Sequence, residues 1–185
     1  MNEVQFKELV QRNAEYAAKQ HVVPGKLENF VAQTPSDFQG LYIITCSDRR
    51  LRLSEFLSLR PREANIIRNA GGRVDADVFR SLEIMGTILP IGQIVVIHHS
   101  DCGGVYTTDD EVREKLSTRA PAHAHEIKDK VFLTFRHLGT EDSVIEDVED
   151  LGAWPFLPKG AKVSGYVYDL DTGLLKEVAP AKGRE

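Results

Sequence analysis

Cysteine is scarce in this sequence: only Cys46 and Cys102 occur among 185 residues. Structural zinc sites built from four cysteines, or from three cysteines and one histidine, are therefore excluded. The two thiols could form at most one disulfide, and a reducing compartment disfavours that bond. Because both cysteines lie beside charged and hydrogen-bonding residues, a shared metal ion is favoured over a disulfide or two unrelated core thiols.

Long hydrophobic runs and an excess of positive charge are also missing. No apolar stretch approaches the ~20 residues of a membrane span, and the N-terminal segment, with Glu3 and Glu8, has no apolar core typical of a secretion signal. The formal net charge is -5, whereas nucleic-acid-binding proteins favour a basic face. We therefore expect a soluble, cytoplasmic protein with neither a nucleic-acid nor a membrane partner.

The composition that remains is ordinary for a globular protein, with 42% hydrophobic and 28% charged residues. A chain of this length can bury roughly 70% of its unfolded surface as one domain. Apolar runs of strand length alternate with helical spacing, which predicts an α/β fold. We expect a central, mostly parallel β-sheet flanked by helices, with an antiparallel edge hairpin near the C-terminus. A single domain is predicted over residues 1–185, with residues 1–39 as an N-terminal helix and arm and residues 180–185 as a frayed tail.

Periodicity places the individual elements along the chain. The predicted strands cover residues 41–45, 64–67, 93–97, 163–170 and 174–178, the last two forming the hairpin. The predicted helices cover residues 3–20, 51–59, 75–89, 125–138 and 141–151, and residues 22–39 are predicted to form a loop. Asp75 is a predicted N-cap, and Thr108 is predicted to cap a helix with an acidic first turn.

Two short segments carry most of the chemistry. Cys46-Ser47-Asp48-Arg49-Arg50 follows one predicted strand, and His98-His99-Ser100-Asp101-Cys102-Gly103-Gly104 follows another. In open α/β sheets, functional groups collect just beyond the carboxyl ends of the strands. Two thiols, an imidazole, a carboxylate and a guanidinium are therefore expected to converge in one crevice.

Such a set of side chains could bind zinc. Cys46, Cys102 and one histidine would supply three ligands and leave one coordination position open, as in catalytic zinc sites. Either His98 or His99 could supply the nitrogen, and the short spacing past a strand end favours His99. A hydrogen-bonded core histidine is the alternative for each of them.

Asp48 could either complete the metal site or control it. As a fourth ligand it would close the site, whereas as a hydrogen-bond acceptor it would orient a zinc-bound hydroxide. Arg50 can pair with Asp48 and hold it off the metal. A surface ion pair of little energetic value is the alternative for these two residues.

The spacing Cys-x-Asp-x-Arg followed by His-x-x-Cys resembles the pattern of the β-class carbonic anhydrases. Here the pattern consists of Cys46, Asp48, Arg50, His99 and Cys102. The segment Arg68-Asn69-Ala70-Gly71-Gly72 resembles the same family, and the resemblance extends over residues 41–110. It is greatest to the short microbial branch, which also includes carbonyl sulfide and carbon disulfide hydrolases.

The resemblance implies one Zn²⁺ per chain, held by Cys46, His99 and Cys102, with Asp48 and Arg50 as paired gate residues. The implied reaction is the reversible hydration of carbon dioxide to bicarbonate and a proton by zinc-bound hydroxide. The resemblance also implies a homodimer, often paired further into a homotetramer.

By its position, Gly103 could offer a backbone N–H to the substrate oxygen, or it could belong to a tight turn that binds no ligand.

Other functions remain open from the sequence. The same ligands would serve a carbonyl sulfide or carbon disulfide hydrolase. A non-catalytic binding module stapled by zinc would use Asp48 or His98 as a fourth ligand. The spacing of Cys46 and Arg52 is that of phosphate-binding loops, but Thr45 stands where such loops usually have histidine.

Overall fold

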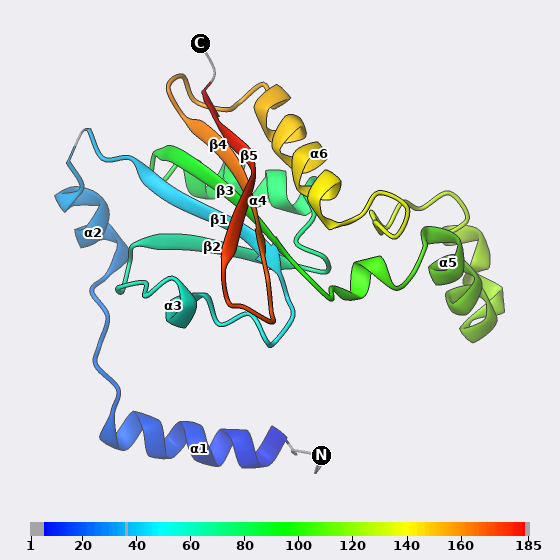
Figure 1. Ribbon diagram of the computed structural model, residues 1–185. Coiled ribbons are helices and arrows are strands. Elements are labelled where there is room, and N and C mark those ends of the chain that lie inside the picture. The colour runs from blue at the N-terminus through cyan, green and yellow to red at the C-terminus, as the bar shows by residue number, and fades with distance from the viewer. Residues whose placement is uncertain (1–5, 36, 184–185) are drawn as a thin grey trace. The chain divides into compact units, whose positions relative to one another are not determined.

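The computed structural model describes residues 6–35 and 37–183 (Figure 1). Contacts within the chain divide it into two compact units, residues 1–36 and 37–185. That residues 1–185 act as one domain stays a prediction. Among the described residues, no helix combines the length and the apolar character that crossing a membrane requires.

The first unit contains two helices, α1 (Phe6–Lys19) and α2 (Leu27–Gln33). The helix predicted over residues 3–20 is confirmed over residues 6–19, whereas residues 3–5 lie outside the described residues. The loop predicted for residues 22–39 is wrong at α2. Pro24 and Pro35 lie on either side of α2 rather than within it, so its seven residues can form about two helical turns.

The second unit is built on a five-stranded sheet with the strand order β2-β1-β3-β4-β5. The strands are β1 (Gly40–Cys46), β2 (Ala64–Asn69), β3 (Ile91–His99), β4 (Lys162–Tyr168) and β5 (Leu175–Gly183). Strands β1 to β4 run parallel to one another, and β5 pairs antiparallel with β4. The predicted α/β fold, with a mostly parallel sheet and an antiparallel edge, is confirmed.

Side chains on both faces of the central strands are buried. On one face, Ile44 and Val96 belong to a core cluster with residues of α4 (Ala76–Gly86) and α6 (Thr140–Ala153). On the other face, Ile43 and Ile97 pack in a cluster with Leu53 of α3 (Leu53–Phe56). Burial on both faces explains why the sequences of β1 and β3 are almost continuously apolar.

Both predicted helix caps are confirmed. Asp75 Oδ1 accepts a hydrogen bond of 2.9 Å from the Val78 amide at the start of α4. At the start of α5 (Asp109–Arg119), Thr108 and Glu111 form a capping box, each side chain accepting from the other's backbone N–H at 3.2 Å. The capping box fixes where α5 begins, close behind the 3₁₀ turn η1 (Gly103–Val105).

The helix predicted over residues 125–138 is wrong. A 3₁₀ helix, η2 (Pro121–Glu126), covers only its first two residues, and residues 131–135 have no regular secondary structure. Backbone amides in this stretch donate to groups distant in the sequence. Phe135 N, for example, donates to Gly104 O at 3.0 Å. Tertiary contacts here outweigh the local helical pattern.

The frayed tail predicted for residues 180–185 is wrong for residues 180–183. Strand β5 continues to Gly183, and Lys182 lies opposite Val163 of β4. Pro180 is compatible with this pairing because β5 is an edge strand, where a residue without an N–H is tolerated. Residues 184–185 lie outside the described residues.

Candidate metal centre

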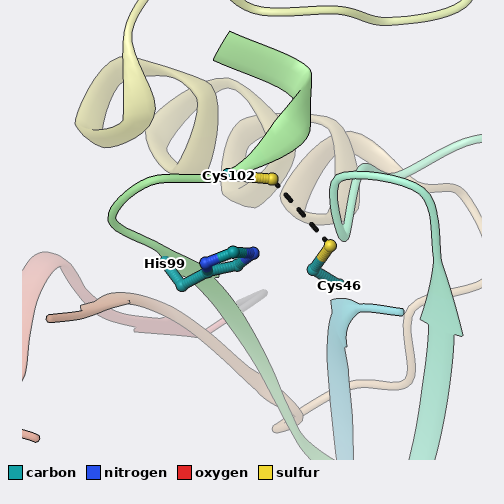
Figure 2. A group of neighbouring side chains, drawn as sticks. All are labelled: Cys46, His99 and Cys102. Atoms are coloured by element: carbon teal, nitrogen blue, oxygen red, sulfur yellow. Dashed lines mark hydrogen bonds between the residues drawn. The ribbon is translucent and has the colours of Figure 1, made fainter. Parts of the chain in front are cut away.

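The carboxyl ends of two neighbouring strands deliver the candidate metal ligands. Cys46 is the last residue of β1, and His99 is the last residue of β3, its parallel neighbour. Cys102 follows His99 after a short turn and precedes η1. Figure 2 shows the three side chains directed toward one another. The convergence predicted from the sequence is confirmed for these three residues.

The cluster has the dimensions of a zinc site. One potential ligand atom from each of Cys46, His99 and Cys102 lies within 4.8 Å of the other two, and all three residues are buried. Both cysteines are free thiols, so the disulfide alternative is wrong. The two Sγ atoms are 3.9 Å apart, and tetrahedral Zn–S bonds of about 2.3 Å would place them ~3.8 Å apart.

The imidazole of His99 is oriented as a metal ligand. Its Nδ1 lies 2.8 Å from the Ser100 carbonyl oxygen, so this nitrogen carries the proton and donates it. Its Nε2 is buried and has no hydrogen-bond partner among the described residues. An unpartnered lone pair beside two thiols fits a bound cation, since a buried polar atom otherwise costs free energy.

His98 lies on the other face of β3 and is excluded from the cluster. Its Nδ1 is 2.8 Å from Ser143 Oγ, and its Nε2 is 3.1 Å from both Gly72 O and Asp147 Oδ2. Because Nε2 faces two acceptors, it carries a proton and has no lone pair for a metal. Of the two candidate histidines, His98 is therefore the hydrogen-bonded core residue, and His99, which spacing favoured, is the one in the cluster.

Charge at the two sulfurs favours a cation. A hydrogen bond from the Cys102 thiol lowers the pKa of Cys46, and the Asp48 amide adds a bond of 3.4 Å to Cys46 Sγ. The same hydrogen bond raises the pKa of Cys102, since ionisation of its thiol would place a second thiolate beside the first. A divalent cation removes this repulsion and allows both sulfurs to be thiolates.

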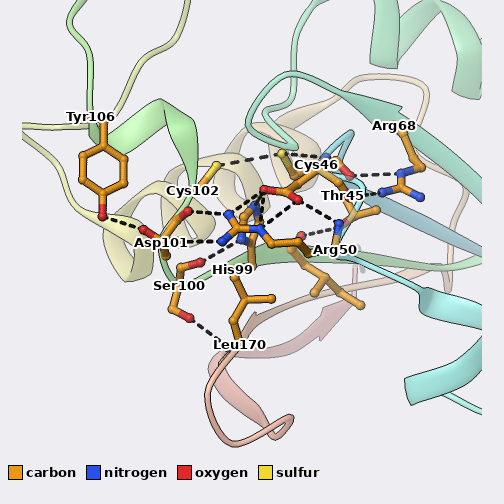
Figure 3. A network of polar contacts seen from close by, with 12 residues as sticks. Thr45, Cys46, Arg50, Arg68, His99, Ser100, Asp101, Cys102, Tyr106 and Leu170 are labelled. Carbon is orange, nitrogen blue, oxygen red and sulfur yellow. Dashed lines mark hydrogen bonds and ion pairs between the residues drawn. The ribbon is translucent and has the colours of Figure 1, made fainter. Parts of the chain in front are cut away.

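Asp48 and Arg50 form a closely bonded pair, and Figure 3 shows Arg50 beside the cluster. The Asp48 carboxylate accepts hydrogen bonds from the Arg50 amide at 2.8 Å and from Arg50 Nη2 at 2.7 Å. Asp48 Oδ2 also lies 3.9 Å from His99 Nε2. The bonds from Arg50 hold the pKa of Asp48 well below its usual range, so the carboxylate is charged.

Arg50 is held from its other side by Asp101, which the sequence did not single out. Arg50 Nη1 donates to Asp101 Oδ2 at 2.6 Å, and Tyr106 Oη donates to Asp101 Oδ1 at 2.6 Å. The only signal in the sequence was a charged residue between His99 and Cys102. Asp101 also has a φ of 56°, which a sequence does not reveal.

Arg68 supports the loop that carries Asp48. From β2, its Nε donates to Cys46 O at 3.0 Å and its Nη2 to Asp48 O at 2.7 Å. The segment of residues 68–72 resembles the family in sequence, but the role of its arginine depends on a contact across strands. Arg68 therefore helps to set the distance between Asp48 and the thiols.

A cavity of about 440 Å³ opens at the cluster. It is lined by residues of both ligand loops, including Gly103 and Gly104, and by residues 132–135. A Cβ on Gly103 would meet no atom within 4 Å, whereas one on Gly104 would lie 2.4 Å from Phe135. Packing therefore requires glycine at position 104, and the predicted substrate contact of Gly103 stays a prediction.

A buried cysteine–histidine–cysteine cluster at the carboxyl edge of a parallel sheet, next to a cavity, defines a metal-dependent α/β enzyme. Comparison with known proteins agrees. The family model described as carbonic anhydrase matches residues 41–175, and the chain belongs to the β-carbonic anhydrase family. Zinc is the metal of this family.

Three similar proteins illustrate the relationship. The carbon disulfide hydrolase of Saccharolobus solfataricus is 34% identical over 161 residues, covering 77% of this chain and 78% of its own. Beta-carbonic anhydrase 1 of Mycobacterium tuberculosis is 32% identical over 142 residues, covering 75% and 81%. The crystal structure of a carbonic anhydrase from Streptococcus mutans is 36% identical, with a TM-score of 0.78 over 96% of this chain and 99% of that chain.

Proposed function

We propose that this protein is a zinc-dependent carbonic anhydrase, which interconverts carbon dioxide and water with bicarbonate and a proton. The observation that carries the proposal is the buried cluster of Cys46, His99 and Cys102 beside an apolar cavity. Three protein ligands leave zinc one position for water or substrate, which is typical of catalytic sites. When bound, zinc lowers the pKa of water and so supplies a nucleophile near neutral pH.

Asp48 and Arg50 are proposed to orient that water. The Asp48 carboxylate is charged, lies beside His99 Nε2 and is held by Arg50. A fixed carboxylate accepts a hydrogen bond from the attacking water and directs the oxygen lone pair toward the substrate carbon. Arg50 also prevents Asp48 from taking the open metal position.

The cavity is proposed to select a small neutral substrate. Its wall includes Phe132, Leu133 and Phe135, which favour an uncharged linear molecule over bulk water. The backbone N–H of Gly103, at the cavity surface, is proposed to donate to a substrate oxygen as negative charge develops there.

Stopped-flow measurement of carbon dioxide hydration by the zinc-loaded protein tests the proposal. We expect catalysis that disappears when a chelator removes the metal and returns when zinc is added. A protein that contains one zinc ion per chain and does not accelerate hydration would refute the proposed reaction while leaving the metal site intact.

Hydrolysis of carbon disulfide or carbonyl sulfide is the second candidate. It is supported by the 34% identity to the Saccharolobus solfataricus enzyme. The cavity, at about 440 Å³, is also larger than a triatomic molecule requires. Each C=S group would be exchanged for C=O with one water, releasing hydrogen sulfide. A sulfide-release assay with both substrates, run beside the hydration assay, separates the two activities.

A zinc-stapled binding module is less well supported, because it needs a fourth protein ligand. His98 is bonded on the other face of β3, and Asp48 is held by Arg50. Neither residue is arranged to close the metal site.

We further propose a cytoplasmic homodimer or homotetramer, as the family resemblance implies. Helix α1 has no buried residue, although Phe6, Val10 and Tyr16 are apolar or aromatic, which supports association with a further surface. Size-exclusion chromatography with light scattering is expected to give two or four times the chain mass of 20.7 kDa. A monomeric mass at micromolar concentration would contradict this assembly.

A further inference from the structure

One wall of the cavity is an irregular segment in a strained conformation. We call residues 132–135 (Phe132, Leu133, Thr134 and Phe135) the pocket strap; all four line the cavity and none belongs to a helix or strand. Leu133 has a φ of 56°, in the left-handed region that a γ-branched residue rarely adopts. Such a conformation is unfavourable and persists only where surrounding contacts impose it.

A single carboxylate binds the strap on one side. Asp109, the first residue of α5, accepts from the Phe132 amide at 2.7 Å and from the Thr134 amide at 3.0 Å. It also accepts from Thr134 Oγ1 at 2.6 Å. These three bonds flank Leu133 in the sequence, so Asp109 holds the backbone on both sides of the strained residue.

A buried guanidinium binds the strap from the other side. Arg73 Nη1 donates to Leu133 O at 3.2 Å, and its guanidinium lies 5.7 Å from the centre of the Phe135 ring. Arg73 is itself held by Asp147 at 3.0 Å and by Glu146, both on α6. Arg73 thereby links the backbone of Leu133 to α6, which packs against the sheet.

Phe135 packs against the loop after β2 and against the turn after Cys102. Its ring is buried, and Cβ atoms built on Gly71 and Gly104 would lie 3.1 Å and 2.4 Å from it. Gly71 precedes the close approach of Gly72 to Cys46, and Gly104 follows Cys102 by two residues. The packing of Phe135 against these two glycines therefore fixes the position of the strap relative to the metal cluster.

We propose that the pocket strap sets the size limit of the substrate pocket, with Asp109 and Arg73 as the positioning residues that hold it. This inference rests on the proposed function and deepens it. The pocket strap would determine whether the site accepts only oxygen-containing linear substrates or also those that contain sulfur. Sulfur is larger than oxygen, and a rigid apolar wall discriminates by size, whereas a loosened wall does not. Neither positioning residue touches the reacting atoms.

Asp109→Asn tests the proposal because it keeps the side-chain size and weakens the three bonds. The probes are cyanate and thiocyanate, two linear triatomic anions that differ only in carrying an oxygen or a sulfur atom. Their dissociation constants are measured from the visible spectrum of the cobalt-substituted protein. We expect the affinity for thiocyanate relative to cyanate to rise by about threefold or more. A smaller rise, or a fall, overturns the proposal.

Hydrogen exchange supplies the second readout. The amides of Phe132 and Thr134 are expected to exchange about tenfold faster in Asp109→Asn, because their acceptor is weakened. Unchanged exchange would show that Asp109 does not hold the strap. Asp110→Asn is the matched control, since this neighbouring carboxylate pairs only with Arg113 among the contacts described, and both readouts should stay at wild-type values.

Thr134→Val provides a milder variant that keeps the backbone amide and removes only the hydroxyl bond to Asp109. It should shift the anion ratio in the same direction by a smaller factor, and a shift in the opposite direction contradicts the proposal. Failure of the proposed function can be distinguished from failure of the strap proposal. If the zinc protein were inactive, the cobalt-substituted protein would still give dissociation constants for both anions.

Discussion

His98 and His99 are neighbours on β3, yet their side chains serve different purposes. His99 turns an unpartnered Nε2 toward the thiols, whereas both nitrogens of His98 face polar groups in the core. Successive residues of a strand point to opposite faces of the sheet, so only one of two adjacent histidines can reach the cluster.

Replacing each histidine by alanine should therefore give two different defects. His99→Ala is expected to lower zinc content from one per chain to near zero in metal analysis, because a buried ligand is lost. His98→Ala should keep its zinc but lose about 1–3 kcal/mol of stability in urea unfolding, since Ser143 and Asp147 lose a partner. Loss of zinc in the His98 variant alone would reverse the assignment.

Cys102→Ala should remove the metal and the hydration activity together. The remaining Cys46 and His99 supply only two ligands, fewer than the three protein ligands of a catalytic zinc site. Metal analysis after dialysis against zinc-free buffer measures the first effect, and stopped-flow hydration measures the second. A variant that keeps both would refute the ligand assignment.

Asp48→Ala should separate metal binding from catalysis. Zinc content should stay near one per chain, while hydration falls by about 10²-fold or more, as for other groups that position a proton-transfer partner. Loss of zinc in this variant would instead identify Asp48 as a metal ligand, and retained activity would refute its orienting role.

At the scale of elements, the loop after β2 brings backbone very close to β1. Gly72 has a φ of 75°, and a Cβ there would lie 2.8 Å from the Cys46 amide nitrogen and 2.9 Å from the Thr45 carbonyl carbon. Only glycine satisfies both the conformation and the contact. The position of Cys46 thus depends on a residue that binds no metal.

Gly72→Ala is expected to destabilise the protein by at least about 1–3 kcal/mol from backbone conformation alone. The new methyl group would also displace Cys46, so the variant should lose zinc more readily to a competing chelator. Gly152→Ala in α6 is the control, because its Cβ meets nothing within 4 Å and its stability should be unchanged or slightly higher. Equal stabilities of the two variants would contradict the close approach.

Across the whole molecule, carboxylates that accept hydrogen bonds and form ion pairs make the free energy of unfolding depend on pH. The pKa of Asp101 is lowered by the Tyr106 hydroxyl and Arg50, and that of Glu111 by Arg136. A group whose pKa is lower in the folded state stabilises the protein above its unfolded pKa and loses that contribution as pH falls through the folded value. Burial raises the pKa of Asp150, which acts in the opposite direction.

The free energy of unfolding should consequently fall as the pH decreases below about 4, near the unfolded pKa of Asp and Glu. Urea titrations of the metal-free protein between neutral and acidic pH measure this dependence. High salt should reduce the effect, because these pairs are largely exposed and screened. Stability that stays constant as the carboxylates are protonated would contradict it.

Local patterns in the sequence predicted the five strands, helices α1, α4 and α6, both helix caps and the two segments that carry the ligands. These features depend on periodicity and on hydrogen bonds between near neighbours. The short strand ends at Cys46 and His99 were therefore predictable, as was their meeting at one edge of a parallel sheet.

Tertiary structure alone decided how Asp101 and Arg68 hold the Asp48–Arg50 pair and why residues 131–135 do not continue a helix. It also excluded His98, the alternative to the favoured His99, from the metal cluster. It also extended β5 to Gly183 through pairing with β4. Each of these outcomes depends on partners distant in the chain, whose packing and hydrogen bonds outweigh local propensity.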